Sequence, residues 1–289
     1  MKKLAIIGVG LIGGSLGMAL IKSRKYRVIG VGRHKEKLIL AKKLNAVDEF
    51  TTDFSKGVSS ADVVIVCTPV DIIDKTIKNI LPYLKKGAIV SDVGSVKGKV
   101  LEKVKTVLKN KIAKRNNICF IGAHPMAGSE KTGVRFASEN LFKDATVVLV
   151  KEKLTNQDAF AQIKNIWQLT GARIKMFDVK SHDKSVALIS HLPHLIAFNL
   201  CNMVKKLKQA KDISSLLAGS FKDITRVADS NPRDWAAICN MNKEELKKAI
   251  NIFIKYLNET KKKLGDIKAL EKIYSDAKSA RLKLLQTGA

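Results

Sequence analysis

The sequence predicts an α/β domain built on a doubly wound parallel sheet, followed by an all-helical domain. Over residues 1–177, short runs rich in Val and Ile alternate with helical patterns, as expected when helices connect parallel strands that are buried on both faces. After Asp178 the strand patterns stop and the remaining chain is helical in pattern. A length of 289 residues also fits two domains. We therefore expect a first domain over 1–177 and a second over 178–289.

The elements follow from apolar periodicity and from turn residues. In the second domain, Pro193 should kink or interrupt the first helix, and Asn231-Pro232 marks a turn before the third. Strands are predicted at Leu4–Gly8, Arg27–Val31, Asp62–Cys67, Ala88–Asp92, Ile118–Ile121, Ala145–Val150 and Arg173–Met176. Helices are predicted at Ile12–Lys22, Lys35–Leu44, Ile72–Leu81, Lys97–Leu108 and Asn156–Leu169, and then over about 179–209, 212–228, 233–257 and 260–285.

The composition is that of a globular protein, with 46% apolar and 27% charged residues. This excludes disordered and collagen-like chains. The four cysteines, Cys67, Cys119, Cys201 and Cys239, form no CxxC pair, so neither a disulfide scaffold nor a zinc site is indicated. We expect reduced thiols, no metal and a cytoplasmic location.

A net charge of +27 raises the question of nucleic-acid binding. The excess is mostly lysine spread along the chain, with only nine arginines and few aromatic residues between the lysines. A reader of bases would need arginine clusters and stacking residues. We therefore expect a solvated lysine-rich surface and no nucleic-acid partner. Such a surface would attract a small anionic substrate.

The N-terminal apolar run over residues 4–21 has the basic start of a signal peptide. Five glycines interrupt this run, and no A-x-A cleavage site follows it. Glycines at this spacing suit a strand, turn and helix better than a secretory segment, so we expect neither export nor a membrane partner.

The first chemical motif is Gly8-x-Gly10-x-x-Gly13, which follows a predicted strand and opens a predicted helix. Gly8 permits a tight turn, Gly10 lets the backbone approach a pyrophosphate, and Gly13 allows close packing of helix on strand. Leu11 and Ile12 complete the loop at the helix N-terminus, where amides face the phosphates. The motif predicts a Rossmann-type domain that binds a dinucleotide.

The end of the second strand bears on cofactor choice. An NAD site usually has Asp or Glu there, whereas this chain has Gly32-Arg33. A 2′-phosphate would gain a charge-assisted partner in Arg33, which favours NADP over NAD. Alternatively, Arg33 stacks on adenine or points to water. Thr68-Pro69 closes another strand where cofactor contacts are expected, although Pro69 also fits a plain strand terminator.

Three further segments carry polar residues suited to chemistry. Ser95, in Asp92–Lys97, is placed either to cap the following helix or to face the nicotinamide. His124 lies in a glycine-rich loop after a strand, where an imidazole suits a proton acceptor better than packing. Ser190-His191-Leu192-Pro193-His194 lies in the helical domain, and substrate contact fits it better than a metal, since no further ligands have suitable spacing.

Together these segments resemble the prephenate and arogenate dehydrogenase family over nearly the whole chain. The departure from the family pattern is Gly32-Arg33, where many members keep an acidic residue. The matching motifs are Gly8-x-Gly10-x-x-Gly13, the segments Asp92–Lys97, Gly122–Glu130, Ser190–His194 and Gly219–Arg226, and Trp235 nine residues after Arg226.

The resemblance implies oxidative decarboxylation of prephenate to 4-hydroxyphenylpyruvate, with hydride transfer to NAD(P)⁺, in tyrosine biosynthesis. It implies that His124 is the base for the 4-hydroxyl, that Ser95 orients both groups, and that Arg226 binds the ring carboxylate. It also implies a homodimer paired through the helical domain. Further expected substrate-site residues are His194, His191, Ser190, Trp235 and Ser129, with Glu130 beside Ser129.

Other functions remain open at this stage. Arogenate dehydrogenase would give tyrosine directly. Another two-domain hydroxyacid dehydrogenase would need a Lys with an Asn four residues on, and neither Lys180 nor Lys184 has one. A non-catalytic NADP-sensing protein would not need the combination of His124, Ser95 and Arg226.

Overall fold

The computed structural model describes residues 1–151, 156–207 and 213–287, and it divides into two compact units, Met1–Lys243 and Glu244–Ala289. The first unit contains all of the strands described and the first helices of the predicted second domain. Because the two units are separate bodies, each is described by itself. The predicted boundary between residues 177 and 178 stays a prediction.

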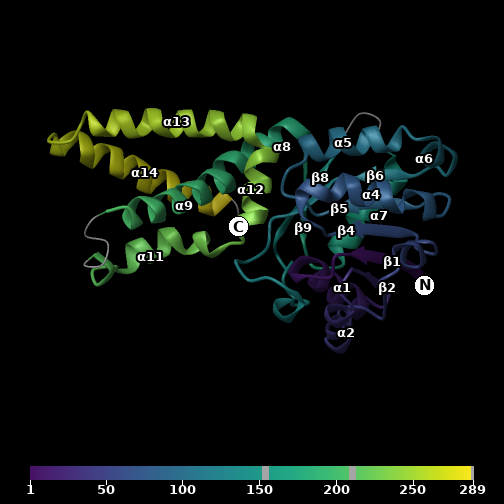
Figure 1. Ribbon diagram of the computed structural model, residues 1–289. Coiled ribbons are helices and arrows are strands. Elements are labelled where there is room, and N and C mark those ends of the chain that lie inside the picture. The colour runs from purple at the N-terminus through teal and green to yellow at the C-terminus, as the bar shows by residue number, and fades with distance from the viewer. Residues whose placement is uncertain (152–155, 208–212, 288–289) are drawn as a thin grey trace. The chain divides into compact units, whose positions relative to one another are not determined.

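A six-stranded parallel sheet forms the centre of the first unit, with strand order β3-β2-β1-β4-β5-β6 (Figure 1). This order confirms the predicted doubly wound fold, in which the crevice at the carboxyl ends of β1 and β4 is the expected ligand position. The strands are β1 (Lys2–Ile7), β2 (Tyr26–Val31), β3 (Glu49–Thr51), β4 (Val63–Val66), β5 (Ile89–Asp92) and β6 (Cys119–Ile121).

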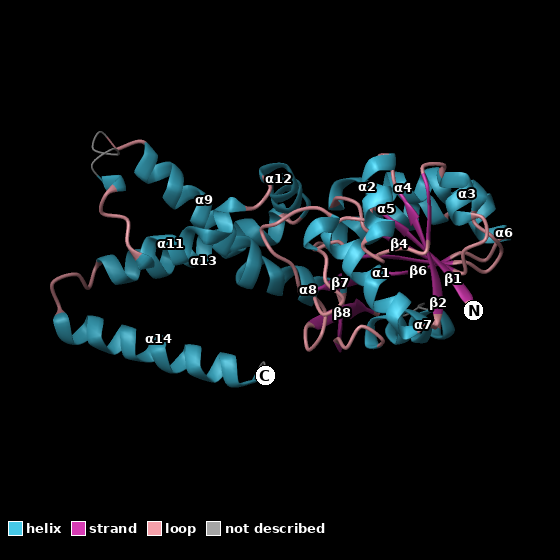
Figure 2. Ribbon diagram, turned by 90° about the horizontal axis from the view of Figure 1, so that it is seen from below, coloured by secondary structure: helices cyan, strands magenta, loops and turns pink. Residues whose placement is uncertain are grey.

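The sheet is buried on both faces because successive residues of each strand point to opposite sides. In β1, Leu4 and Ile6 belong to one core cluster, and Ala5 and Ile7 belong to the other. Helices α1 and α7 pack in the first cluster, and α4 and α5 pack in the second. Figure 2 shows the helices flanking the magenta strands on both sides. Continuous Val and Ile runs are therefore needed in the central strands.

A second sheet has the order β7-β8-β9 and consists of β7 (Ala123–Pro125), β8 (Thr146–Val150) and β9 (Arg173–Phe177). β7 pairs antiparallel with β8, while β9 pairs parallel with β8. The last two predicted strands thus form a sheet of their own. β7 replaces the predicted glycine-rich loop around His124, which pairs with Val148 in the strand ladder.

The helices of the α/β part agree with the prediction except for two short ones, α3 and α6, that were not expected. Helices α4, α5 and α7 each begin one residue later than predicted. The bounds are α1 (Leu11–Ser23), α2 (Lys35–Lys43), α3 (Phe54–Val58), α4 (Ile73–Ile80), α5 (Gly98–Leu108), α6 (Lys111–Arg115) and α7 (Gln157–Gln168), with 3₁₀ turns η1 (Val70–Ile72), η2 (Leu81–Tyr83) and η3 (Val134–Phe136).

The first predicted helix after residue 178 is interrupted, as Pro193 required. Helix α8 (Val179–Val186) leads into a π-helical turn, η4 (Ala187–His191), and then into α9 (Leu192–Lys205). Proline has no N–H to continue an α-helical ladder, and π turns are frequent at functional sites. The predicted helix end at 208–209 and the next start at 212 lie outside the described residues.

The rest of the helical region is more broken than predicted. Helix α11 (Gly219–Thr225) runs into a 3₁₀ turn, η5 (Arg226–Asp229). Helix α12 (Pro232–Met241) begins at the predicted turn, where the Asn231 side chain accepts hydrogen bonds from two main-chain amides. The single helix predicted over 233–257 is wrong, because the chain breaks at Asn242, whose buried side chain makes tertiary hydrogen bonds.

The second unit contains α13, which begins at the unit boundary (Lys243–Lys261), and α14 (Ile267–Thr287). None of the described side chains of α14 is buried. Large apolar side chains are exposed on both helices, at Ile252, Ile254, Tyr256, Leu257, Ile267, Tyr274, Leu282, Leu284 and Leu285. Exposed apolar surface of this extent is typical of an interface.

One helical run, Val179–Lys205, is long and apolar enough to span a membrane by composition alone, and 28% of its most apolar window is buried. The core helix of a globular protein passes the same test. Three polar residues of this run, His182, Asp183 and His191, hydrogen-bond to other parts of the first unit.

Candidate active site

The glycine loop between β1 and α1 leaves open space at the N-terminus of α1. Gly8 has φ +95°, and a Cβ there would lie 2.6 Å from the carbonyl oxygen of Cys67. A Cβ on Gly13 would lie 2.3 Å from the carbonyl oxygen of Gly8, so helix and loop pack at backbone distance. At Gly10, by contrast, a Cβ would meet nothing within 4 Å. Gly10 therefore borders open space at the N-terminus of α1, where a phosphate could approach the start of the helix.

The neighbouring strand ends offer further contacts for a dinucleotide. Thr68 and Pro69 follow β4, and the Thr68 hydroxyl is buried with no hydrogen-bond partner among the described residues. Arg33 follows β2 and is exposed, next to His34, which precedes α2 without capping it by its side chain. An orphaned buried hydroxyl and an open glycine loop on adjacent strands fit a dinucleotide at the sheet's carboxyl edge.

A buried ion pair fixes the chain just before His124. The carboxylate Oδ2 of Asp92 lies 2.5 Å from Nζ of Lys97, and both side chains are fully buried. Nζ of Lys97 also donates to the carbonyl oxygen of Ala123 at 2.6 Å, and the amide of Ala123 donates to Oδ1 of Asp92 at 3.2 Å. Burial lowers the pKa of Lys97, while the Asp92 charge opposes that shift. The pair therefore holds both main-chain groups of Ala123.

Ser95 does not cap helix α5, which corrects one of its two predicted roles. The helix begins at Gly98, and its first amides are bound by a residue distant in sequence. Asp183 accepts from the amide of Lys97 at 2.8 Å and from that of Gly98 at 2.7 Å. Ser95 is half-buried in the segment between β5 and α5. Its hydroxyl is thus not committed to the helix terminus.

His124 belongs to a chain of hydrogen bonds that the sequence analysis did not anticipate. Its Nδ1 lies 2.9 Å from Nε2 of His182, and Nδ1 of His182 lies 2.8 Å from Oδ1 of Asp183. The His124 side chain is only 8% exposed. Burial, and then His182, Lys97 and His191, lower the pKa of His124 well below its ordinary value. His124 is therefore neutral near pH 7, as a proton acceptor must be.

His191 is held by Asn242 at the end of α12. The amide nitrogen of Asn242 donates to the carbonyl oxygen of Asp183 at 2.8 Å and lies 3.2 Å from Nδ1 of His191. Because an amide nitrogen only donates, Nδ1 of His191 is the acceptor and Nε2 carries the proton. Burial lowers the pKa of His191 to about 4. Its Nε2–H is buried and has no partner within the described part of the chain, which leaves a donor for a ligand.

His194 and Arg226 form a second polar group. The His194 ring stacks on Trp235 with centroids 3.5 Å apart, and its Nδ1 donates to the carbonyl oxygen of Ser190. Arg226 is paired with Glu130, with 3.3 Å between Nη1 and Oε2. Burial lowers the pKa of His194, and Arg226 adds a smaller effect in the same direction. Arg226 therefore lies within electrostatic reach of His194.

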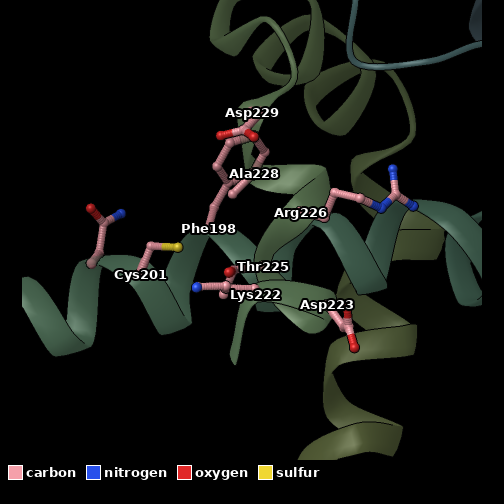
Figure 3. Close-up of a pocket in the computed structure, with 9 residues that line it drawn as sticks. Phe198, Cys201, Lys222, Asp223, Thr225, Arg226, Ala228 and Asp229 are labelled. Atoms are coloured by element: carbon pink, nitrogen blue, oxygen red, sulfur yellow. The ribbon is translucent and has the colours of Figure 1, made fainter. Parts of the chain in front are cut away.

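Arg226 also lines a cavity of about 560 Å³ between α9, α11 and η5 (Figure 3). In this view the side chains of Arg226 and Lys222 point in opposite directions. His124 does not line this cavity, and no described contact joins it to Arg226. Ser129 is exposed, and its hydroxyl accepts from the amide of Lys131.

The sequence analysis missed four residues that organise this region: Lys97, His182, Asp183 and Asn242. Each makes at least one contact with a residue distant in sequence; His124 and His182, for example, are 58 residues apart. No sequence signal marked His182 and Asp183 as buried, because helix α8 reads Val-Lys-Ser-His-Asp-Lys-Ser-Val and is mostly polar. Across residues 1–151, 156–207 and 213–287, no group of His, Cys, Asp or Glu could hold a metal ion.

Comparison with known proteins places these features in a family. The family model described as "Prephenate dehydrogenase, nucleotide-binding domain" matches residues 16–176, and "Prephenate dehydrogenase, dimerization domain" matches residues 178–273. A prephenate dehydrogenase of Lactococcus lactis is 32% identical over 286 residues, covering 97% of this chain and 77% of that protein. A cyclohexadienyl dehydrogenase of Zymomonas mobilis is 35% identical over 289 residues, covering 98% and 96%.

Among solved structures, the prephenate dehydrogenase of A. aeolicus in complex with hydroxyphenyl propionate and NAD⁺ superposes with a TM-score of 0.88. It is 32% identical in sequence, and the match covers 99% of this chain and 98% of that one. The fold and the site thus define an NAD(P)-dependent dehydrogenase of two-domain type. The chain belongs to the prephenate dehydrogenase family.

Proposed function

We propose that this chain oxidises and decarboxylates prephenate to 4-hydroxyphenylpyruvate in tyrosine biosynthesis. The observation that carries the proposal is a neutral, buried His124 whose preceding residue is bound by Asp92 and Lys97. A series of contacts connects this base to the glycine loop. Gly8 abuts Cys67, the preceding residue Val66 pairs in register with Asp92, and Asp92 binds Lys97. These contacts support a base that serves the same sheet edge as the glycine loop.

The cofactor would be held by residues at three strand ends. Gly8, Gly10, Leu11, Ile12 and Gly13 would surround the pyrophosphate. Arg33 would face the adenosine end, and Thr68 and Pro69 the nicotinamide end. When bound, the oxidised cofactor supplies the hydride acceptor.

The chain's own contribution is to position the substrate and accept a proton. His124 would take the proton of the 4-hydroxyl, and Ser95 would orient that hydroxyl and the imidazole. His191 would donate from its unpaired Nε2–H to a substrate oxygen. Ser190 fixes the ring of His194, which with Trp235 would form one wall of the pocket. Ser129 remains a candidate in the loop that carries Glu130.

Arogenate is the alternative substrate, and Glu130 is the observation that favours it. Arogenate carries an ammonium group where prephenate carries a keto group, and a carboxylate such as that of Glu130 would bind an ammonium. A two-by-two assay of prephenate or arogenate with NAD or NADP tests the proposal. We expect the highest kcat/KM with prephenate. Higher kcat/KM with arogenate would establish the alternative, and turnover of neither would contradict the proposed activity.

Replacing Arg226 by Ala should raise the KM for prephenate by about tenfold or more, because the ring carboxylate loses a charged, bidentate partner. The KM for the cofactor should stay unchanged in this variant. Arg226→Lys keeps the charge but not the paired hydrogen bonds, so its KM for prephenate should lie between those of the wild type and Arg226→Ala. Arg233→Ala, which removes an exposed arginine on α12, is the control. A rise in the cofactor KM instead would move Arg226 to the other half of the site.

NADP should be used at least as well as NAD. Arg33 is exposed at the end of β2, and the adenosine 2′-phosphate would be its charge-assisted partner. Arg33→Ala should lower kcat/KM for NADP by about tenfold and leave kcat/KM for NAD within about twofold. Lys37→Ala, an exposed lysine on α2, serves as the control. A tenfold preference for NAD that Arg33→Ala does not alter would show that Arg33 does not select the cofactor.

The protein should form a homodimer through its helical region in the cytoplasm. Its match to a dimerization domain and the exposed apolar side chains of α13 and α14 support this assembly. Light scattering at micromolar concentration should give twice the mass of the 31.8-kDa chain. A monomeric mass under those conditions would contradict the expectation.

A further inference from the structure

The hydrogen-bond chain from His124 through His182 to Asp183 fixes which nitrogen of each ring carries a proton. Asp183 has two oxygens that accept from three donors: the amides of Lys97 and Gly98 and Nδ1 of His182. Burial would raise the pKa of Asp183, but the His182 side chain and these amides outweigh it and lower the pKa. Asp183 is therefore an ionised carboxylate, which only accepts hydrogen bonds.

The ionised Asp183 determines which ring nitrogens of His182 and His124 carry a proton. Since Asp183 only accepts, Nδ1 of His182 must carry a hydrogen. In a neutral His182 ring, Nε2 then has the lone pair, and Nδ1 of His124, 2.9 Å away, must be the donor. The two rings meet edge to face at 76°, so the contact is made by ring nitrogens and is not a stack.

We propose that His182 and Asp183 are positioning residues that hold His124 in the Nδ1–H tautomer and leave its Nε2 as the proton acceptor. The inference extends the proposed function, because it states how the base is prepared for the substrate hydroxyl. The charged and titratable groups that face His124 are Lys97 at the start of α5, His182 on α8 and His191 on the π turn. Of these, His182 is the one hydrogen-bonded to the His124 ring.

Two substitutions of His182 separate positioning from packing. His182→Gln keeps an acceptor for the Nδ1–H of His124 and a donor for Asp183. His182→Leu has similar bulk but offers neither. We expect kcat for prephenate to fall by about 100-fold in His182→Leu and by less than about tenfold in His182→Gln, while the substrate KM changes by less than about threefold in both. Lys184→Gln, which changes an exposed lysine on the same helix as His182, is the control and should leave all values unchanged.

Nitrogen-15 NMR of the histidine rings reads the tautomer without substrate or turnover. The chain has five histidines, so single substitutions assign each signal. Wild type and His182→Gln should show His124 protonated on Nδ1, and His182→Leu should lose that preference. Protonation of His124 on Nε2 in the wild type would overturn the proposal, as would equal kcat losses in the Gln and Leu variants.

The nitrogen-15 spectrum tests the inference about the His124 tautomer independently of the proposed activity. If His182→Leu fails to fold, the wild-type spectrum and the Gln variant still decide the tautomer. If the wild type shows the expected Nδ1–H signal yet turns over neither prephenate nor arogenate, the proposed function fails and the positioning inference stands.

Discussion

Replacing His124 with Asn should lower kcat for prephenate by about 100-fold or more, because the variant has no basic group to accept the 4-hydroxyl proton. Asn is close in size and can still hydrogen-bond to His182, so we expect the fold and the substrate KM to change little. Steady-state kinetics of the two proteins measures both quantities. The size of this effect reflects the position of His124: it is 8% exposed, neutral and bound through Ala123 to the buried ion pair.

Two controls test whether a lower kcat in His124→Asn reflects loss of the base and not loss of the fold. Thermal unfolding should show a similar melting temperature for the variant, which excludes loss of the folded state. Lys184→Gln changes an exposed residue with no part in the proposed site and should leave kcat unaltered. A folded His124→Asn enzyme with near-normal kcat would remove His124 from the role of base.

Replacing Lys97 with Met should lower the free energy of unfolding by about 3–5 kcal/mol, because it leaves the carboxylate of Asp92 buried without its cation. Both side chains are fully buried, so solvent does not screen the loss. The carbonyl of Ala123 also loses its donor. Urea unfolding of the wild type and the variant gives the difference directly.

The matched control for Lys97 is the double variant Asp92→Asn with Lys97→Met, which removes both charges together. It should recover part of the lost stability, because the cost of the single change comes from an uncompensated buried charge. Lys99→Met alters an exposed lysine of the same helix and should change stability by less than about 1 kcal/mol. If Lys97→Met also lowered the free energy of unfolding by less than about 1 kcal/mol, the buried Asp92–Lys97 pair would contribute little to stability.

The sequence predicted the six-stranded parallel sheet well because its central strands are buried on both faces. Such strands need continuous apolar runs, and four of them, β1, β2, β4 and β5, stand out between helical patterns. β3 (Glu-Phe-Thr) and β7 (Ala-His-Pro) were missed because each has only three residues and no continuous apolar run, whereas the equally short β6 (Cys-Phe-Ile) extends an apolar run that starts at Ile118. The break at Asn242 was missed for a different reason: a single buried amide ends α12 through contacts with Asp183 and His191.

The candidate site was predicted only in part. Motifs that lie within a few residues of one another, such as the glycine loop and the segments around Ser95, His124 and His191, could be found by inspection. The cap on α5 could not, because Asp183 lies 86 residues away from the amide of Lys97. A helix normally takes its N-cap from the preceding residue, and Ser95 fitted that rule locally. Tertiary structure supplied a different acceptor.

The capping of α5 by Asp183 has a consequence for how the protein is made. During translation, the strands of the parallel sheet, the glycine loop and His124 leave the ribosome before residue 183 does. Until that residue emerges, the first amides of α5 lack their acceptor and His124 lacks its imidazole partner. The nascent sheet can therefore collapse around its apolar strands before its base is set. A gene truncated after codon 177 would encode the parallel sheet and the glycine loop, but His124 would lack its partner His182.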